Sequence, residues 1–333
     1  MKNLSLILFE YSLFFSLVLS FVMSVTLCKI LIPFFFKVGF LDNPTARSNH
    51  SKSVALGGGI IIIPLILFSS FLMGYQWSRM NILILFILFL ISLIDDFKNL
   101  TPFLRLITHF FCITAFLFFF LQDKHLIFQI KQSYLIYIYT FFIVTLTWFI
   151  NAFNFMDGID GITAIKAIFI TSSLSFLDLF LGFNGNILHY TILGTSLGFL
   201  FFNWNPAKIF LGDSGSIPLG FLIIYVLIDF AIKGYWLASI ILPLYYILDT
   251  SLTLLIRIYK KKKFWKAHSE HFYQQAVRNG QTHKTVCFKI IFLSIGLFFF
   301  AFFSTLEKNN LMFLIFAIVW CMLFLLNFSK KPL

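Results

Sequence analysis

Charged residues are scarce in this 333-residue chain: they make up 11% of it, whereas hydrophobic residues make up 60%. No water-soluble fold of this length buries that much apolar surface, so lipid must surround most of the chain. The apolar runs also lack the strict alternation of barrel strands, and a backbone in lipid has to satisfy its own hydrogen bonds. The sequence therefore predicts an all-α, polytopic integral membrane bundle.

Cysteine is rare as well, and its four positions lie inside apolar runs without metal-ligand spacing. We therefore expect buried thiols, not disulfides or a metal site. Internal repeats, low-complexity linkers and a separate soluble domain are also missing, which predicts a single domain over residues 1–333. The cysteines are Cys28, Cys112, Cys287 and Cys321.

Apolar runs long enough to cross a bilayer recur along the whole chain. Because a helix needs about 20 apolar residues to cross, they predict about eleven transmembrane helices. The predicted spans are Tyr11–Ile32, Val54–Gly74, Ile82–Ile94, Phe103–Leu121, Ser133–Ile150, Ile162–Gly182, Ile187–Phe202, Ser216–Ile232, Trp236–Ile258, Thr285–Ser304 and Leu311–Phe328.

Positive charge exceeds negative charge, giving a formal net charge of +12. In a soluble protein this excess suggests nucleic acid, but in a membrane protein Lys and Arg mark cytoplasmic loops, which bind anionic headgroups or substrates. We therefore expect the lipid bilayer as a partner and no nucleic acid. The loops that share most Lys and Arg, and that alternate along the chain, are Phe35–Ser53, Asp95–Pro102, Asn151–Gly161, Asn203–Gly215 and Tyr259–Lys284.

Two adjacent acids, Asp95 and Asp96, end the third predicted span. Neighbouring carboxylates in partly dehydrated surroundings are costly unless a cation or a proton joins them. The pair therefore indicates a site for a cation or a shared proton. A pair of solvated loop acids is the simpler alternative.

The fifth span leads into Asn154, Asp157 and Asp160, which recur at every third residue together with Gly158 and Gly161. On a helical turn such residues fall near one face, and the glycines allow close backbone approach. Oxygen ligands of this kind suit Mg²⁺, which often binds one or two carboxylates and substrate phosphates. A helix cap is the alternative, but it explains only one carboxylate.

Glycines and hydroxyls surround Asp213 where the eighth span begins, in the sequence Gly212-Asp-Ser-Gly-Ser216. A helix N-terminus of this composition favours phosphate or metal, although a plain helix cap needs the same residues. His268 and His271 lie in the basic loop that follows Lys260 to Lys263. Without a Cys or a clear third ligand nearby, phosphate contact is favoured over zinc.

Near the N-terminus, Arg47 and His50 precede the glycines Gly57–Gly59. Basic side chains beside flexible glycines can cradle phosphate, though tight helix packing explains the glycines equally well. Together, the acids, glycines and basic side chains on one face are the inventory of metal-assisted phosphoryl transfer. The rival interpretations are a secondary transporter with intramembrane acids and an inactive scaffold for other envelope enzymes.

In order and spacing, these motifs resemble the polyprenyl-phosphate N-acetylhexosamine-1-phosphate transferases of glycosyltransferase family 4, which include the WecA, WbpL and MraY types. Any one motif is unspecific, but five in order, from Asp42 to about Val286, are strong evidence. The similar pieces are Asp42-x-Pro-x-x-Arg47-x-x-His50 with the triple glycine, Asp95-Asp96, the stretch Asn151-x-x-Asn-x-x-Asp-Gly-x-Asp-Gly161, Asn203 to Asp213, and His268-x-x-His271-x-Tyr-Gln.

The resemblance implies an enzyme of the bacterial inner membrane whose active site faces the cytoplasm. Undecaprenyl phosphate attacks the β-phosphate of a UDP-N-acetylhexosamine, UMP leaves, and a lipid-diphosphate-sugar forms. Mg²⁺, with Mn²⁺ as an alternative, bridges the diphosphate. The product begins O-antigen or another cell-envelope polysaccharide, and the resemblance is compatible with a homodimer.

The resemblance also assigns roles to individual residues. Asp213 resembles the metal-binding acid, and Asp213 and Asn154 are the predicted metal ligands. Asp95 and Asp96 resemble the pair that organises or deprotonates the lipid phosphate. Phe210 with Asn203 looks like a uracil platform. The predicted catalytic residues are Asp95, Asp96, Asp157, Asp160, His268 and His271, and the predicted substrate-binding residues are Arg47, His50, Lys52, Asn151, Asn154, Asn203, Phe210 and Arg105.

Within the family, Arg105 and the run Phe264-Trp-x-Ala-His268 favour the WbpL-like O-antigen initiators. The His-x-His-His arrangement expected of the peptidoglycan enzyme is missing, so a phospho-MurNAc-pentapeptide transferase is the alternative within the family. The chain also reads His268-Ser-Glu-His271 where relatives often read His-Arg-x-His. The candidates to replace that arginine are Lys52, Lys266 and Arg278.

Overall fold

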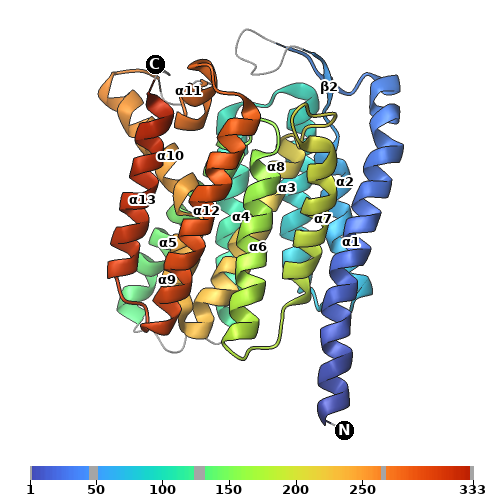
Figure 1. Cartoon of the computed structure of the whole chain (residues 1–333), viewed down its shortest axis with the longest axis vertical. Coiled ribbons are helices and arrows are strands. Elements are labelled where there is room, and N and C mark those ends of the chain that lie inside the picture. The colour runs from blue at the N-terminus through green and yellow to red at the C-terminus, as the bar shows by residue number, and fades with distance from the viewer. Residues whose placement is uncertain (1, 45–51, 124–131, 264–267, 331–333) are drawn as a thin grey trace.

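The computed structural model describes residues 2–44, 52–123, 132–263 and 268–330, which form an upright bundle of helices (Figure 1). The helices are α1 (Lys2–Val38), α2 (Gly58–Leu72), α3 (Arg79–Lys98), α4 (Pro102–Asp123), α5 (Gln132–Phe155), α6 (Ile162–Phe180), α7 (Ile187–Asn203), α8 (Asp213–Phe230), the π-helical turn η2 (Ala231–Tyr235), α9 (Trp236–Ile241), α10 (Leu244–Tyr259), α11 (Phe272–Arg278), α12 (His283–Leu306) and α13 (Met312–Ser329). The two short strands are β1 (Leu41–Asp42) and β2 (Val54–Ala55).

Helix length and composition confirm the predicted fold class. Within the described residues, eight helices are long and apolar enough to cross a membrane. Two further apolar helices, α2 and α7, are shorter, and α9 and α10 together occupy the predicted span Trp236–Ile258. The protein is a multi-pass α-helical membrane protein, while the count of eleven spans stays a prediction.

α3 and α5 extend beyond their predicted ends, and both carry candidate site residues. α3 ends only where Asn99 adopts the left-handed conformation (φ 49°) and donates its backbone N–H to the Asp95 carbonyl oxygen. α5 continues to Phe155. The following side chains therefore lie on the last turns of helices and not in loops: Asp95, Asp96, Asn151 and Asn154.

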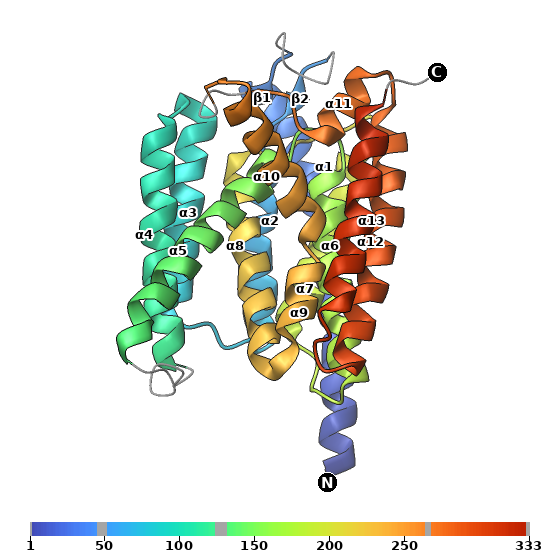
Figure 2. The same cartoon turned by 90° about the vertical axis from the view of Figure 1, so that its left-hand side faces the viewer.

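The polar loops gather at one end of the bundle. The β1–β2 hairpin, the connection from α3 to α4, and α11 lie at this end, whereas α1 begins at the opposite end (Figures 1 and 2). This is the grouping that alternating spans predict. We name it the polar end and define it by these three segments.

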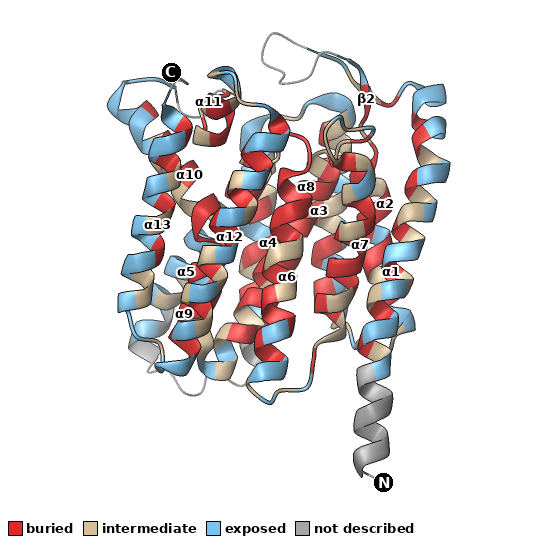
Figure 3. Cartoon of the chain, in the orientation of Figure 1, coloured by how far each residue is buried: buried red, intermediate tan, exposed pale blue. Residues whose placement is uncertain are grey.

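Burial separates the core helices from those that face lipid (Figure 3). α6 and α8 are buried along most of their length, whereas α1 and α13 are mostly exposed. Large exposed side chains such as Phe14, Phe71 and Phe141 are apolar, as a lipid-facing surface requires. The four cysteines are buried and free, as predicted.

A break at Leu242 and Pro243 separates α9 from α10. The Tyr246 N–H bonds to the Pro243 carbonyl oxygen at 2.9 Å, so the Leu242 carbonyl needs another donor. Lys166 of α6, which is 1% exposed, supplies it from Nζ at 2.6 Å. An ionisable group at this depth is costly unless it has a partner, and here the pairing fixes where α10 begins.

The triple glycine packs α2 against the start of α8. Gly58 and Gly59 donate their N–H groups to the carbonyl oxygens of Phe210 at 2.9 Å and Leu211 at 2.8 Å. A Cβ atom on Gly59 would overlap the backbone of Gly215. The glycines therefore allow close helix packing, which is the second of the two explanations considered for them.

Gly59→Ala should separate α2 from α8 and lower stability, because overpacking a close contact costs about 1–3 kcal/mol. We expect a lower thermal unfolding midpoint for the detergent-solubilised protein. The control, Leu72→Ala at the exposed end of the same helix, should unfold near the wild-type temperature. An unchanged midpoint for Gly59→Ala would contradict the tight contact.

Candidate active site

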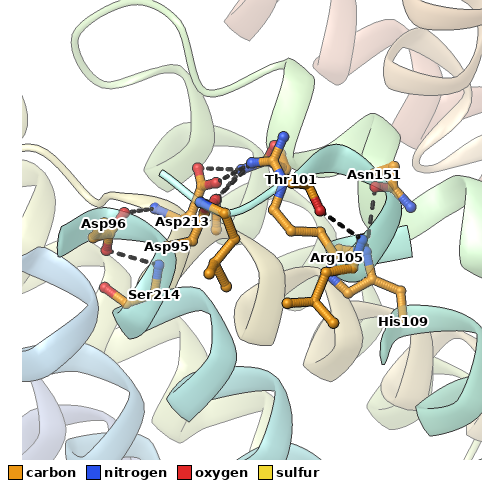
Figure 4. A network of polar contacts seen from close by, with 12 residues as sticks. Asp95, Asp96, Thr101, Arg105, His109, Asn151, Asp213 and Ser214 are labelled. Atoms are coloured by element: carbon orange, nitrogen blue, oxygen red, sulfur yellow. Dashed lines mark hydrogen bonds and ion pairs between the residues drawn. The ribbon is translucent and has the colours of Figure 1, made fainter. Parts of the chain in front are cut away.

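Four helices bring polar side chains together at the polar end (Figure 4). α3 supplies Asp95 and Asp96 from its last turn, α4 supplies Arg105 from its first turns, and α8 begins at Asp213. The last turn of α5 adds Asn154. We refer to these five residues as the acid cluster.

Arg105 joins two acids that come from distant parts of the chain. Its Nη1 atom lies 2.7 Å from Asp95 Oδ2 and 2.8 Å from Asp213 Oδ2. The other oxygen of Asp213 accepts a hydrogen bond from Asn154 Nδ2 at 2.8 Å, and the same amide lies 2.8 Å from Ser216 Oγ. The guanidinium thus offsets two carboxylates that would otherwise repel each other.

Asp96 faces a different partner, the N-terminus of α8. Its two carboxylate oxygens accept the backbone N–H groups of Asp213 at 2.8 Å and Ser214 at 3.0 Å. Gly212 precedes this helix with φ +72°, and a Cβ atom there would lie 2.8 Å from Asp96 Oδ2. A carboxylate is favourable at a helix N-terminus, so α3 caps α8 from outside.

The adjacent acids Asp95 and Asp96 are therefore tolerated because each has its own donors. Asp95 is 6% exposed, and its Oδ1 accepts the Leu100 N–H at 2.5 Å. The cation that the sequence predicts for this pair is supplied in part by Arg105. The interpretation as two solvated loop acids does not fit these contacts.

A histidine that the sequence analysis missed lies behind the acid cluster. His109, one turn after Arg105 on α4, places Nδ1 3.2 Å from Asn151 Oδ1, and Asn151 Nδ2 donates to the Thr147 carbonyl oxygen at 2.7 Å. The signal available in the sequence was a polar residue four positions after Arg105 in an apolar span. Asn151 thus contacts α4, while its predicted substrate contact stays a prediction.

Asp157 and Asp160 share a motif but occupy different environments. Burial, with a smaller contribution from the negative charge of Asp96, raises the pKa of Asp157 to about 7. Burial also acts to raise the pKa of Asp160, but hydrogen bonds from His283, Asn205 and other donors outweigh it and lower that pKa below its usual value. Asp157 is therefore suited to exchange a proton near neutral pH, whereas Asp160 stays ionised.

Asp160 and Asn203 hold the loop between α7 and α8. Asp160 Oδ2 accepts Asn205 Nδ2 at 2.7 Å and the Ala207 N–H at 3.1 Å. Asn203 accepts the Gly161 N–H at 2.9 Å and donates to the Ile209 carbonyl oxygen at 2.8 Å. Both residues therefore stabilise the loop between α7 and α8. The catalytic role of Asp160 and the substrate-binding role of Asn203 stay predictions.

Of the remaining candidates, the structure describes Phe210 and Lys52. Phe210 is half-buried, and its backbone N–H bonds to the Ala55 carbonyl oxygen at 2.7 Å. Lys52 is exposed. Arg47, His50 and Lys266 lie outside the described residues.

His268 contacts His271, and His271 contacts Phe155, the residue that follows Asn154 of the acid cluster. The ring centroids of the two histidines are 4.9 Å apart, and the His271 ring stacks on Phe155 at 6.0 Å. Burial, together with the nearby charges of His271 and Arg257, lowers the pKa of His268 to about 4. Among the described residues no group of three His, Cys, Asp or Glu side chains is placed to hold a metal ion. Phosphate contact by His268 and His271 stays a prediction.

A basic cavity of about 520 Å³ borders His268. Glu270, between the two histidines, binds Arg257 Nη1 at 2.5 Å and Lys262 Nζ at 3.0 Å. Arg278, a candidate for the missing arginine, donates to Ser269 Oγ. The lining residues are Arg257, Lys262, Lys263, His268, Ser269, Glu270 and Arg278.

A helical membrane bundle with clustered acids, a bridging arginine and a helix N-terminus at one end has the form of a membrane-bound phosphoryl-transfer enzyme. Comparison with known proteins agrees. Residues 78–231 match glycosyl transferase family 4. The chain is 33% identical over 258 residues to the phospho-N-acetylmuramoyl-pentapeptide-transferase of Buchnera aphidicola subsp. Acyrthosiphon pisum, covering 63% of this chain and 70% of the relative.

Two further relatives extend the comparison. The chain is 26% identical over 331 residues to the probable undecaprenyl-phosphate N-acetylglucosaminyl 1-phosphate transferase of Bacillus subtilis, covering 93% of this chain and 88% of that protein. It is 29% identical over 266 residues to the phospho-N-acetylmuramoyl-pentapeptide-transferase of Streptococcus sanguinis, covering 73% and 80%. The chain belongs to glycosyl transferase family 4, as its motifs predicted.

Proposed function

We propose that this protein transfers an N-acetylhexosamine 1-phosphate from a UDP-sugar to undecaprenyl phosphate, releasing UMP and forming a lipid-diphosphate-sugar. The observation that carries the proposal is Asp213, which stands at the N-terminus of α8 with Arg105 and Asn154 on its carboxylate. Relatives named for both this reaction and its pentapeptide variant support it. Family membership favours the transferase over a secondary transporter.

The acid cluster fits Mg²⁺, or Mn²⁺, held together with substrate. Mg²⁺ usually takes one or two carboxylates and completes its shell with water and phosphate oxygens, so a cluster without a closed protein-only metal site agrees with it. Asp213 would hold the metal, with Asn154 beside it. When bound, the ion supplies positive charge that stabilises the diphosphate as negative charge shifts to the leaving UMP.

The chain's own residues bind, orient and balance charge. Asp95 and Asp96 stand where α3 reaches the membrane surface, which suits them to organise the phosphate of the lipid. That phosphate is largely ionised near neutral pH, since its second pKa is about 6, so it attacks the β-phosphorus directly. Asp157 is the group suited to accept a proton from the minor fraction of the lipid phosphate that is still singly protonated, and Arg105 limits repulsion between the acids and the approaching anions.

The histidines and the basic cavity are suited to bind the diphosphate and sugar of the donor substrate. His268 and His271 would contact the diphosphate and sugar, and Arg47, His50 and Lys52 would add phosphate contacts. Phe210 and Asn203 are the proposed uracil platform. The relatives include both an N-acetylglucosaminyl 1-phosphate transferase and pentapeptide-transferases. Within this family we propose the O-antigen branch, an N-acetylhexosamine as the sugar, and a homodimer.

The proposed setting is the bacterial inner membrane, with the polar end toward the cytoplasm. Most Lys and Arg of the connecting segments lie in the loops of that end, as the positive-inside rule requires. UDP-sugars are cytoplasmic metabolites, so the donor substrate approaches from the same side.

Asp213→Asn should lose more than nine-tenths of the UMP release seen with UDP-N-acetylglucosamine and undecaprenyl phosphate, because the amide keeps the shape but removes the charge. A tenfold loss corresponds to about 1.4 kcal/mol in the barrier. Glu307→Gln, which changes an exposed acid at the opposite end, is the matched control and should be near wild type. If Asp213→Asn keeps more than about a tenth of the activity, Asp213 is not a principal metal ligand.

Removal of divalent metal should abolish turnover, since the acids and the diphosphate carry like charge. We expect no UMP release in EDTA and recovery on addition of Mg²⁺ or Mn²⁺, measured with the same substrates. Ca²⁺ at equal concentration, which prefers a larger shell, is the control cation. Full turnover in EDTA would sink the metal assignment.

The orientation is tested by labelling with a membrane-impermeant thiol reagent. Asn99→Cys, at the polar end, should be protected in intact cells and react after the membrane is opened, because its loop is proposed to be cytoplasmic. Asn310→Cys, in the α12–α13 link at the opposite end, should react in intact cells. The native cysteines are buried and give little background. Reaction of Asn99→Cys from outside would overturn the orientation.

A further inference from the structure

A buried acid outside the predicted site lies inside α10. Asp249 is completely buried and follows the apolar residues Ile247 and Leu248. Burying an ionisable group at this depth costs free energy, so such a group is usually paired with other polar groups and has a functional role. Its partners all come from its own helix or from the segment that carries His271.

Asp249 caps the first turn of α11. Its Oδ1 accepts the Phe272 N–H at 3.0 Å, and its Oδ2 accepts the Tyr273 N–H at 3.2 Å. The hydroxyls of Tyr245 and Thr253 donate to the same two oxygens at 3.1 and 3.4 Å. Because every donor needs an acceptor and both oxygens are used, the site fits a carboxylate but not an amide.

The same carboxylate faces His271, the residue immediately before α11. Nδ1 of His271 lies 3.4 Å from Asp249 Oδ1. A carboxylate beside one ring nitrogen favours the proton on that nitrogen and leaves Nε2 to accept or exchange a proton. Asp249 therefore favours one tautomer of His271 and one orientation of its ring.

Tyr273 connects the Asp249 cap on α11 to the end of α5, which carries Asn154 of the acid cluster. Its side chain is buried, and Oη donates to the Phe155 carbonyl oxygen at 2.9 Å. A Cβ atom on Gly158 would overlap Oη, so the ring fits only against a glycine there. Since Phe155 follows Asn154 directly, the cap on α11 also fixes how this helix docks on the end of α5.

We propose that Asp249 is a positioning residue for the transfer reaction, which orients His271 and docks α11 against the end of α5. The inference rests on the proposed function, in which His271 contacts the diphosphate and sugar of the donor substrate. Asp249 itself touches no substrate. Its effect on the reaction must therefore pass through His271 and through Tyr273.

The first test is Asp249→Asn in the full-length, detergent-solubilised protein. We expect kcat/KM for UDP-N-acetylglucosamine to fall about 10- to 100-fold, by analogy with the loss on removing the carboxylate behind a metal-bound histidine. KM for undecaprenyl phosphate should stay within about twofold. The matched control is Thr250→Val, a change of a buried hydroxyl that bonds only within α10, and it should leave both constants near wild type.

The second test asks whether Asp249 acts through His271. Residues that act together give non-additive losses, so adding Asp249→Asn to His271→Ala should cost much less than Asp249→Asn costs in the wild type, because only the contribution through Tyr273 remains. Multiplied losses would overturn the inference. Tyr245→Phe, which removes one donor and keeps the carboxylate, is the second variant in case Asp249→Asn does not fold. Its smaller loss should also shrink in the His271→Ala background.

Hydrogen exchange supplies a readout that does not depend on turnover. The Phe272 and Tyr273 amides should exchange slowly in the wild type and Thr250→Val and faster in Asp249→Asn. Unchanged exchange, or near-normal kcat/KM in Asp249→Asn while Asp213→Asn is inactive, overturns the positioning role and leaves the proposed function standing. A wild type that releases no UMP overturns the proposed function and this inference together.

Discussion

Negative charge at the polar end has to be balanced before any anionic substrate can approach. Asp95, Asp96 and Asp213 meet beside lipid, where uncompensated carboxylates are costly. Two sets of interactions offset this cost. Arg105 forms ion pairs with Asp95 and Asp213, and the N-terminal amides of α8 donate hydrogen bonds to Asp96. The close packing of the α2 glycines against α8 fixes the position of the α8 N-terminus that binds Asp96.

These contacts compensate the negative charge of the protein's own carboxylates, but not the additional negative charge of the substrates. Arg105 carries one positive charge, and the amides of α8 are partly used by Asp96. A diphosphate and a lipid phosphate together add several negative charges at the same end. Among the described residues the cation paired with the acid cluster is Arg105. A divalent ion that arrives with the donor substrate would offset the added charge, which is the physical basis of the Mg²⁺ proposal.

Much of the fold was predictable from sequence because the hydrophobic requirement of lipid acts on every residue of a span. The acid motifs were also predictable, since Asp95, Asn154 and Asp213 lie at the ends of apolar runs. What could not be predicted depends on partners far apart in the chain. Asp96 and Ser214 are separated by 118 positions, and the different surroundings of Asp157 and Asp160 depend on Asn205 and His283. Asp249 gave only the signal of a lone acid in an apolar run.

The end of α5 links the two halves of the site. Asn154 bonds to Asp213 in the acid cluster, while the next residue, Phe155, stacks on His271 and accepts the hydroxyl of Tyr273. One peptide bond therefore separates the groups that face the metal side from those that face the histidines. A shift of α5 would therefore disturb the Asn154–Asp213 contact and the Phe155–His271 contact at the same time.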